Sequence, residues 1–289
     1  MNKDIFSVLE QKMPTFSKGQ RRIAALICES YDKVAFLTAS KLGQMAGVSE
    51  STVVRFAVEL GYEGYPQMQK AMQEMVLNRL TAVQRMGVTS DLIGSQDIVD
   101  SVLHADAEKL RQTSETVDRK AFHGTVQDLI HAKDIYIIGV RSASALAGIF
   151  GYYLQYLFDR VHIITNSSAG EVMEQLIHIG SEDVVVAFSF PRYSSSTVQG
   201  ISFCRDVGAT VIGITNSMVS PLVPYCDRVL VAKSDMVSIV DSLTAPLSLV
   251  NALIVALAAG REEAIRSNFE RLENIWQQYH IYEKKDGNL

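Results

Sequence analysis

The strongest constraint on the fold is an alternation, in the second two-thirds of the chain, of short β-branched segments with stretches long enough for a helix. The segments cover residues 134–139, 161–165, 183–189, 209–215 and 227–231. Continuous apolar runs of this kind are typical of strands that are buried on both faces. Strands joined by crossover helices pair in parallel. We therefore predict an α/β domain with a doubly wound parallel sheet and helices on both faces.

The first 80 residues have a different pattern and a different charge. Apolar residues recur there at helical spacing, as at Val53, Phe56 and Leu60. Through Arg85 the chain has 11 basic and 8 acidic residues, a net charge of +3, which leaves 16 against 24, or −8, for the remainder. Gly, Ser and Thr punctuate residues 86–96. We therefore predict an all-α domain at residues 1–80, a linker at 81–96 and the α/β domain at 97–289.

Residues 42–56 have the form of a helix-turn-helix. Gly43 allows two helices to approach closely, and Gly47 supplies the turn with a positive φ. Ser49 is placed to cap the second helix, whose Val53 and Phe56 face inward. The alternative interpretation is an ordinary helical hairpin with a glycine turn. The whole pattern, together with the local positive charge, favours DNA binding.

The outward side chains on the first turns of the second helix are those that a recognition helix presents to the major groove. Two arginines of an earlier helix are expected near the DNA backbone, although they also fit a solvated surface. The DNA-binding candidates are Arg21, Arg22, Ser49, Ser51, Thr52 and Arg55. Because few polar groups lie on this face, one copy would bind weakly, and a dimer that reads two half-sites of double-stranded DNA is expected.

Two hydroxyl-rich loops follow the first and third predicted strands, and each opens a helix. They cover residues 139–144 and 189–197. Ligands of doubly wound sheets lie at the carboxyl ends of strands, where a helix amino terminus attracts an anion. Serine hydroxyls add donors, and Arg141 or Arg192 adds positive charge. Helix capping explains either loop alone, whereas the pair predicts a phosphate site. Because the glycine-rich nucleotide motifs are absent from the sequence, a small phosphorylated molecule fits best.

The sequence predicts no cofactor and no metal site. Cys28, Cys204 and Cys226 lie far apart, and no histidine pair has the spacing of metal ligands. Reduced thiols and the lack of an apolar amino-terminal run fit a cytoplasmic location. The most apolar stretch, residues 245–259, is shorter than the roughly 20 residues of a membrane span. We interpret it as a buried helix and expect no membrane association.

With these features in place, the chain resembles the RpiR/MurR family of bacterial transcriptional regulators. The resemblance rests on residues 53–56, 60–65, 139–144, 188–194 and 215–222, and covers nearly the whole chain. In that family a helix-turn-helix domain is joined to a sugar isomerase (SIS) domain that senses a phosphosugar and usually performs no chemistry. The resemblance implies that the pocket is lined by Ser142, Ser144, Ser189, Ser194 and Thr197.

One loop departs from the family pattern. The second loop of many SIS enzymes reads Ser-x-Ser-Gly-x-Thr, whereas residues 190–193 here are Phe-Pro-Arg-Tyr. The complete set of ligand-binding candidates, from the loops and from the resemblance, is Arg141, Ser142, Ser144, Ser189, Arg192, Ser194, Ser195 and Thr197.

These features predict a DNA-binding transcriptional regulator of carbohydrate-metabolism genes that is controlled by a sugar phosphate and performs no catalysis. The alternative is a phosphosugar isomerase with an accessory helical domain, which would need a general base. Glu171, Glu174 and His178 are placed on one predicted helical face for that role. An amphipathic helix that buries Val172 and its apolar neighbours Leu176 and Ile179 explains the same segment and is favoured.

A third interpretation, a pure interaction module, draws on an apolar stripe near the carboxyl terminus. The stripe consists of Ile265, Phe269, Leu272, Trp276 and Tyr279. Such a stripe is typical of an intramolecular core or of a dimer seam. We expect it to help hold a homo-oligomer, a dimer or a tetramer, together with the helical region at residues 97–131.

Overall fold

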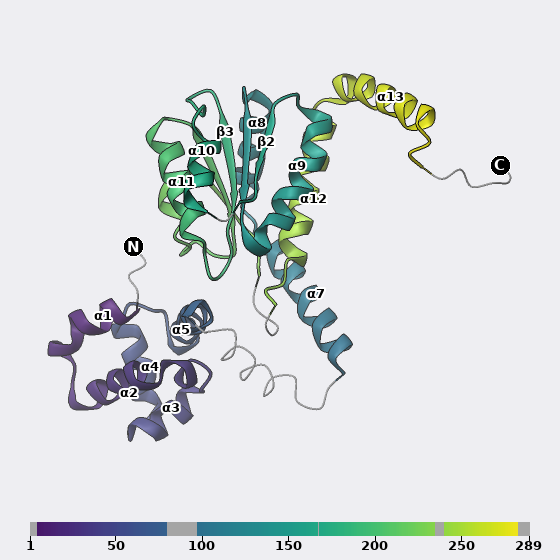
Figure 1. Ribbon diagram of the computed structural model, residues 1–289. Coiled ribbons are helices and arrows are strands. Elements are labelled where there is room, and N and C mark those ends of the chain that lie inside the picture. Colours follow the sequence, from purple (N-terminus) through teal and green to yellow (C-terminus); the bar gives the residue numbers. More distant parts are fainter. Residues whose placement is uncertain (1–4, 80–96, 167, 235–239, 283–289) are drawn as a thin grey trace. The chain divides into compact units, whose positions relative to one another are not determined.

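The structure is a computed structural model that describes residues 5–79, 97–166, 168–234 and 240–282, and it contains two compact units (Figure 1). The first unit spans Met1–Gly94 and the second spans Ser95–Leu289. The predicted linker at residues 81–96 lies outside the described residues. No helix of the described residues is long and apolar enough to cross a membrane.

The first unit is helical, as predicted. Its helices are α1 (Ile5–Lys12), α2 (Lys18–Val34), α3 (Ala39–Ala46), α4 (Glu50–Glu59) and α5 (Tyr65–Arg79). They surround a core in which Phe56 of α4 packs edge to face on Phe16, with ring centroids 5.2 Å apart. The buried Tyr65 hydroxyl donates to the carbonyl of Leu37 at 2.6 Å, and burial raises the pKa of Tyr65 to about 12.

The predicted turn between α3 and α4 is confirmed. Gly47 ends α3 with a φ of +64°, a left-handed conformation that glycine adopts without steric cost. Ser49 caps α4 and accepts a hydrogen bond from the backbone N–H of Thr52 at 3.3 Å. At Gly43 a Cβ atom would lie 2.9 Å from the carbonyl oxygen of Val48. The close approach of the two segments therefore requires glycine at that position.

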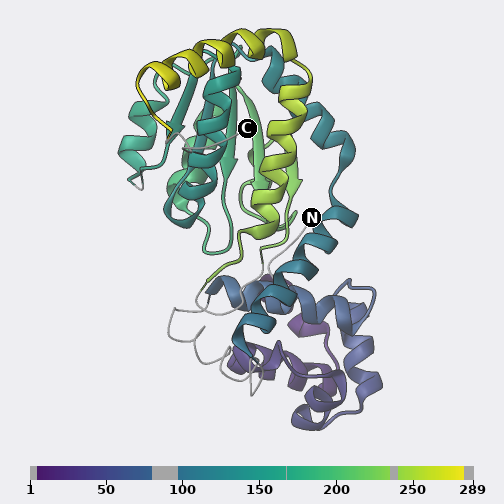
Figure 2. The ribbon, with the colours of Figure 1, turned by 90° about the vertical axis from the view of Figure 1, so that its right-hand side faces the viewer.

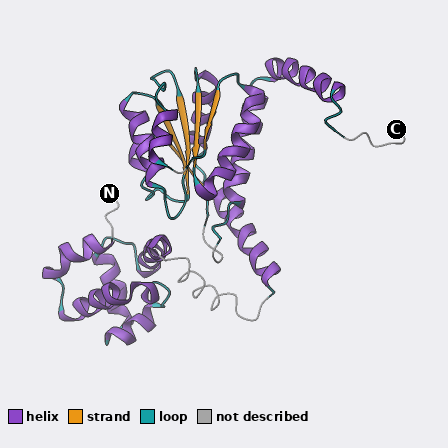
Figure 3. Cartoon of the chain, viewed as in Figure 1, coloured by secondary structure: helices purple, strands orange, loops and turns teal. Residues whose placement is uncertain are grey.

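The second unit contains the five predicted strands (Figure 3). They are β1 (Ile135–Gly139), β2 (Val161–Ile164), β3 (Val184–Phe188), β4 (Thr210–Thr215) and β5 (Arg228–Val231). The helices are α7 (Ile98–Thr116), α8 (Arg119–His131), α9 (Ser144–Leu157), α10 (Ala169–Gln175), α11 (Ser195–Asp206), α12 (Thr244–Ala259) and α13 (Glu262–Gln278). All neighbouring strands pair in parallel in the order β2-β1-β3-β4-β5, which confirms the predicted fold class.

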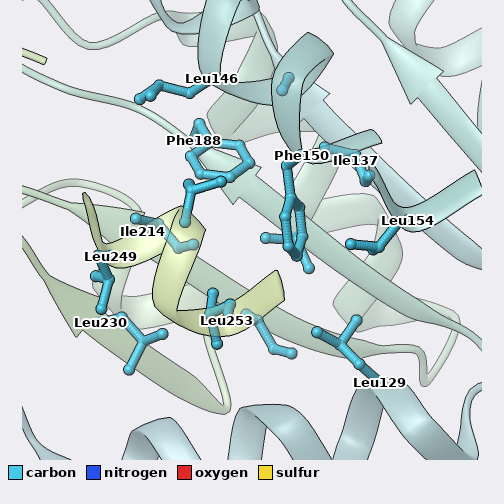
Figure 4. Close-up of a cluster of buried hydrophobic side chains, with 14 of the residues drawn as sticks. Leu129, Ile137, Leu146, Phe150, Leu154, Phe188, Ile214, Leu230, Leu249 and Leu253 are labelled. Atoms are coloured by element: carbon cyan, nitrogen blue, oxygen red, sulfur yellow. The ribbon is translucent and has the colours of Figure 1, made fainter. Parts of the chain in front are cut away.

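Helices cover both faces of the sheet because successive strand residues point to opposite faces. Ile137 and Phe188 point into the layer with α8, α9 and α12, where Phe188 packs edge to face on Phe150 of α9 (Figure 4). Ile138 and Val185 point into the opposite layer, against α10 and α11. This burial on both faces explains why the strand sequences are continuously apolar.

The structure corrects two details of the sequence interpretation, and the role in an oligomer that was expected of the carboxyl-terminal stripe stays a prediction. Residues 245–259 lie in α12, but only one face of this helix is buried, and Val255 is 67% exposed. Helix α10 ends at Gln175, so His178 does not share a helical face with Glu171 and Glu174. Of the carboxyl-terminal stripe, Ile265 is buried, Phe269 is partly exposed, and Tyr279 is 66% exposed.

Gly43→Ala tests the approach of α3 to the following turn. The added methyl group meets backbone atoms that cannot rotate away, so we expect the first unit to lose about 1–3 kcal/mol of unfolding free energy in urea denaturation followed by circular dichroism. In the control variant Gly64→Ala the new Cβ meets nothing closer than Pro66 Cδ at 3.8 Å. Equal stability of the two variants would contradict the assignment.

Candidate functional site

The predicted DNA-reading face lies at the amino-terminal end of α4. Ser49, Ser51 and Arg55 are exposed, and Thr52 is half-buried. The Ser49 hydroxyl lies 2.9 Å from the hydroxyls of both Ser51 and Thr52, and Arg55 Nε donates to the carbonyl of Ser51 at 3.2 Å. The structure therefore brings four of the candidates together in one polar network on the surface of the second helix.

The other two DNA-binding candidates lie on α2, and both are exposed. Arg21 donates to the carbonyl of Pro14 at 3.2 Å. The Arg22 guanidinium lies against the turn between α3 and α4. It is so close to Gly47 that a Cβ added to this glycine would lie 3.0 Å from Arg22 Nη1. Arg22 is therefore beside the turn that precedes the reading helix. The sequence interpretation missed Val54 as a candidate: it is 39% exposed on α4 and offers an apolar contact of the kind that thymine methyl groups make.

The two hydroxyl-rich loops lie at a topological switch point of the sheet. Strand β1 pairs with both β2 and β3, so the chain leaves β1 towards one side of the sheet and leaves β3 towards the other. In sheets of this strand order the crevice between such loops is the usual ligand site. The sequence placed both loops after strands, and the strand order makes those strands neighbours.

The hydroxyls of the loops differ in burial and in hydrogen bonding. Ser142 and Ser195 are exposed, whereas Ser189 is buried. Ser144 is the first residue of α9, and its hydroxyl donates to the carbonyl of Arg141 at 2.6 Å. Ser194 is the N-cap of α11 but makes no side-chain capping bond.

The first turn of α11 carries two further hydroxyls. The Ser194 hydroxyl lies 2.7 Å from that of Ser196, which the sequence interpretation did not select. Thr197 is fully buried, and its Oγ1 has no hydrogen-bond partner among the described residues. Buried hydroxyls in proteins are nearly always hydrogen-bonded. Thr197 Oγ1 is therefore unusual, and it shares this feature with the buried hydroxyls of Thr125, Thr215 and Ser234 among the described residues.

Arg141 and Arg192, one in each loop, have left-handed backbone conformations. Their φ values are +58° and +62°. A left-handed conformation costs a residue with a Cβ about 1–2 kcal/mol relative to the right-handed one. Both side chains are exposed, and neither guanidinium has a hydrogen bond or ion pair among the described residues.

The residue that follows Arg192 connects this loop to the next strand. The Tyr193 hydroxyl donates to Asn216 Oδ1 at 2.7 Å, and Asn216 is buried at the carboxyl end of β4. The aromatic residue that breaks the family pattern therefore fixes the β3 loop to β4. Asn216 lies in residues 215–222, which carry part of the family resemblance, but no local pattern indicated its bond to a residue 23 positions away.

A polar cluster attaches α7 to the chain segments that follow β5. Asp106 of α7 accepts hydrogen bonds from Ser242 at 2.6 Å and from Thr244 at 2.8 Å. Lys109 is buried, with its Nζ 3.6 Å from Asp106 Oδ1. Burial acts to raise the pKa of Asp106, but the two hydroxyl bonds and the charge of Lys109 outweigh it and lower that pKa.

Among the described residues, neither the cysteines nor a cluster of metal-binding side chains forms a second functional site. Burial raises the pKa of Cys204 and of Cys226 to about 12, so both thiols are protonated at neutral pH. Cys28 is exposed, and none of the three forms a disulfide. The described residues contain no group of three or more His, Cys, Asp or Glu side chains that could hold a metal ion.

Comparisons with known proteins identify a domain in each unit. Residues 3–78 match the model of the helix-turn-helix domain of the RpiR family, and residues 128–256 match the model of the SIS domain. The regulator HexR of Pseudomonas aeruginosa is 23% identical to the chain over 217 residues, covering 74% of this chain and 73% of HexR. An HTH-type transcriptional regulator of Haemophilus influenzae is 23% identical over 268 residues, covering 90% and 92%.

Solved structures share the fold. The sugar isomerase domain of an RpiR transcription factor from Sphaerobacter thermophilus is 24% identical, with a TM-score of 0.59, and covers 62% of this chain and 99% of its own. The Vibrio vulnificus NanR protein complexed with ManNAc-6P is 22% identical, with a TM-score of 0.59, and covers 95% of this chain and 98% of its own.

Asp106→Ala tests the attachment of α7. It leaves two hydroxyls and the buried Lys109 without their acceptor, so we expect the second unit to lose about 1.5–3 kcal/mol of unfolding free energy at pH 7. Because folding lowers the pKa of Asp106, its contribution is present above the unfolded carboxyl pKa of about 4 and is lost as the pH falls further. The difference between wild type and variant, measured by urea denaturation, should therefore shrink below about pH 4.

The control for this experiment removes an exposed charge from the same helix. Glu115→Ala deletes a carboxylate whose one ion pair among the described residues is with the exposed Arg111. Exposed pairs of this type contribute about 0.3–0.5 kcal/mol, so a loss as large as that of Asp106→Ala would refute the special role of the cluster.

Proposed function

The chain belongs to the RpiR family of helix-turn-helix transcriptional regulators, and we propose that its affinity for operator DNA changes when a sugar phosphate binds at the carboxyl ends of β1 and β3. Relatives that match most of the chain are named as transcriptional regulators. The regulated genes would belong to carbohydrate metabolism, and the location would be the cytoplasm.

The observation that carries the effector site is the convergence of anion-binding groups at the switch point. Helices α9 and α11 begin at neighbouring strands, and helix amino termini favour anions. A phosphate oxygen would supply the acceptor that the buried Thr197 hydroxyl lacks. The unpaired guanidiniums of Arg141 and Arg192 would supply the countercharge, as charge-assisted bonds to phosphate are strong. ManNAc-6P, bound by the NanR relative, is a ligand of this chemical class.

We assign Ser142, Ser144, Ser189 and Ser194 to the same pocket, with Ser195 at its exposed side. We expect the pocket to use no cofactor and no metal, because hydroxyls, backbone N–H groups and guanidiniums can all donate hydrogen bonds to a phosphate.

We further propose that the chain senses the sugar phosphate and does not convert it. An isomerase needs a carboxylate or imidazole that is free to move a proton. Glu171 accepts a hydrogen bond from the Asn166 side chain at 3.1 Å, and its backbone N–H donates to the capping residue Ser168, which supports a structural role at the start of α10. Val172, Leu176 and Ile179 are buried, as an amphipathic structural segment requires.

DNA binding is assigned to the network on α4 together with Arg21 and Arg22. A homo-oligomer would present two such faces to paired half-sites. Binding of the effector would change the populations of two arrangements of the reading helices, and a coupling free energy of about 1–3 kcal/mol would change operator affinity by roughly 5–150-fold.

A thermal-shift screen with phosphorylated sugars tests the effector site. At 100 times its dissociation constant an effector adds about 2.7 kcal/mol of stability. We expect Ser142→Ala/Ser194→Ala to abolish the shift while DNA binding remains. A full panel of sugar phosphates that leaves both stability and operator affinity unchanged would overturn the proposal. Turnover of a phosphosugar that Glu171→Gln abolishes would establish the isomerase instead.

Arg192→Gly and Arg192→Ala separate the role of the guanidinium from that of the backbone. Both variants remove the charge, so we expect both to weaken effector binding by about tenfold or more. Glycine accepts the left-handed backbone, so Arg192→Gly should exceed Arg192→Ala in stability by about 1 kcal/mol. Effector affinity equal to that of wild type in both variants would remove Arg192 from the site.

Arg55→Ala tests the reading helix. We expect affinity for an operator selected from random duplexes to fall by about 1–3 kcal/mol, measured by fluorescence anisotropy at several salt concentrations. If Arg55 contacts a phosphate, the dependence of affinity on salt also becomes shallower. Lys33→Ala, which removes an exposed charge from the last turn of α2, is the control. Equal effects of the two variants would show that only net charge matters.

A further inference from the structure

Two exposed valines lie on the outer side of the reading helix α4. Val54 is 39% exposed and Val58 is 55% exposed, and their spacing of four residues makes them neighbours on one side of the helix. The other side buries Val53, Phe56 and Ala57 in the core of the first unit. Valine is less favourable than alanine in a helix, because its branched side chain loses rotamer freedom there. An exposed valine therefore stabilises the protomer little, and an apolar group of a binding partner would explain this residue type.

The first unit holds α4 so that this side of the helix is accessible. Helix α4 packs on α2, α3 and α5, and the helices of the first unit, coloured purple to blue, lie together in both ribbon views (Figure 2). At the amino end Ser49 caps the helix. At the carboxyl end Gln20 Nε2 donates to the Glu59 carboxylate at 2.9 Å, and Lys12 Nζ donates to the Glu59 carbonyl. Because both ends are fixed, the direction of the Val54 side chain relative to the rest of the unit is fixed as well.

The charge next to Val54 favours contact with base edges over contact with phosphates. Glu50 is exposed and lies one turn before Val54, on the same side of α4. A carboxylate at this position repels the phosphate backbone, but it can accept a hydrogen bond from the amino group that cytosine or adenine presents in the major groove. The positive charge lies on the neighbouring side, where Arg55 Nε donates to the carbonyl of Ser51. The Glu50–Val54 side of α4 therefore suits the base edges, and the Arg55 side suits the phosphates.

Of the two valines, Val54 is the better placed to reach a base. In helix-turn-helix proteins the amino-terminal residues of the recognition helix contact the base edges. Val54 follows directly on the first turn of α4, next to the hydroxyl network of the cap, whereas Val58 lies in the last turn beside Glu59. A helix that enters the groove with its amino-terminal turns therefore brings Val54 to the bases and leaves Val58 farther from them.

We propose that Val54 contacts the C5-methyl group of one thymine in each operator half-site and so makes the chain selective for thymine at that position. This inference rests on the proposed DNA-binding function and adds the base that is read. The thymine methyl is the apolar group that base pairs present in the major groove, so it complements an exposed valine. Cytosine, the other pyrimidine, lacks this methyl group and would leave Val54 without an apolar partner.

A double-mutant cycle between Val54 and single thymine methyl groups tests this proposal. The full chain is titrated by fluorescence anisotropy with an operator selected from random duplexes. Each thymine position is replaced in turn, in both half-sites, by deoxyuridine, which removes the methyl group and leaves base pairing intact. Burial of one methyl group changes affinity about fourfold, so we expect wild type to bind one of these duplexes roughly 15-fold more weakly than the unmodified operator. For Val54→Ala this difference should fall to about twofold or less, because the shorter side chain does not reach the methyl group.

Val58→Ala is the matched control, because it makes the same change on the same side of α4. It should respond to deoxyuridine as wild type does, and circular dichroism should show all three proteins equally folded, since alanine favours the helix. The proposal is overturned if no deoxyuridine weakens binding of wild type, a result that needs no variant, or if Val54→Ala responds as wild type does. A selection that yields no preferred duplex would refute the proposed DNA-binding function and this inference with it, so the two failures are distinguishable.

Discussion

The hydrogen bonding of β1 to both β2 and β3 is the constraint on which the second unit depends. Strand β1 lies between β2 and β3, and α9 and α10 cover opposite faces of the sheet. The loops after β1 and β3 therefore leave neighbouring strand ends in opposite directions. The same register gives each face its own core, one around Phe150 and Phe188 and the other around Ile138 and Val185. The proposed effector site therefore follows from strand order as much as from the residues in the loops.

The sequence predicted each end of each strand to within one residue because the strands are rich in apolar, β-branched residues, and such runs have clear ends where polar residues bound them. It also predicted the left-handed conformation of Gly47, because glycine marks such turns. It could not predict the left-handed conformations of Arg141 and Arg192, because nothing in the residue type indicates that conformation. The contact between Asp106 and Ser242 joins residues 136 positions apart, which no local pattern encodes.

The interpretation of residues 245–259 as a buried helix was wrong for an instructive reason. Periodicity reports the direction of burial only when the opposite face is polar. Helix α12 exposes Ser248, Asn251 and Val255, a set too weakly polar to contrast with the core side. A helix that is apolar on every face is predicted to be buried on all sides. In a single protomer this prediction is wrong for α12, which buries only one face. It holds again if a second copy covers the exposed face.

Several costly features of the isolated chain are explained by groups that lie outside it. Left-handed arginines, a buried Thr197 hydroxyl without a partner and a glycine in the middle of α9 each raise the free energy of the protomer alone. The first two lie in the loops at the switch point, where an anion would compensate them. At Gly148 an added Cβ would meet nothing within 4 Å among the described residues. Helix α9 follows the loop after β1, so its first turn would lie beside an effector bound at the switch point. A change in the position of α9 on effector binding would give the proposed regulation a physical route through a single helix.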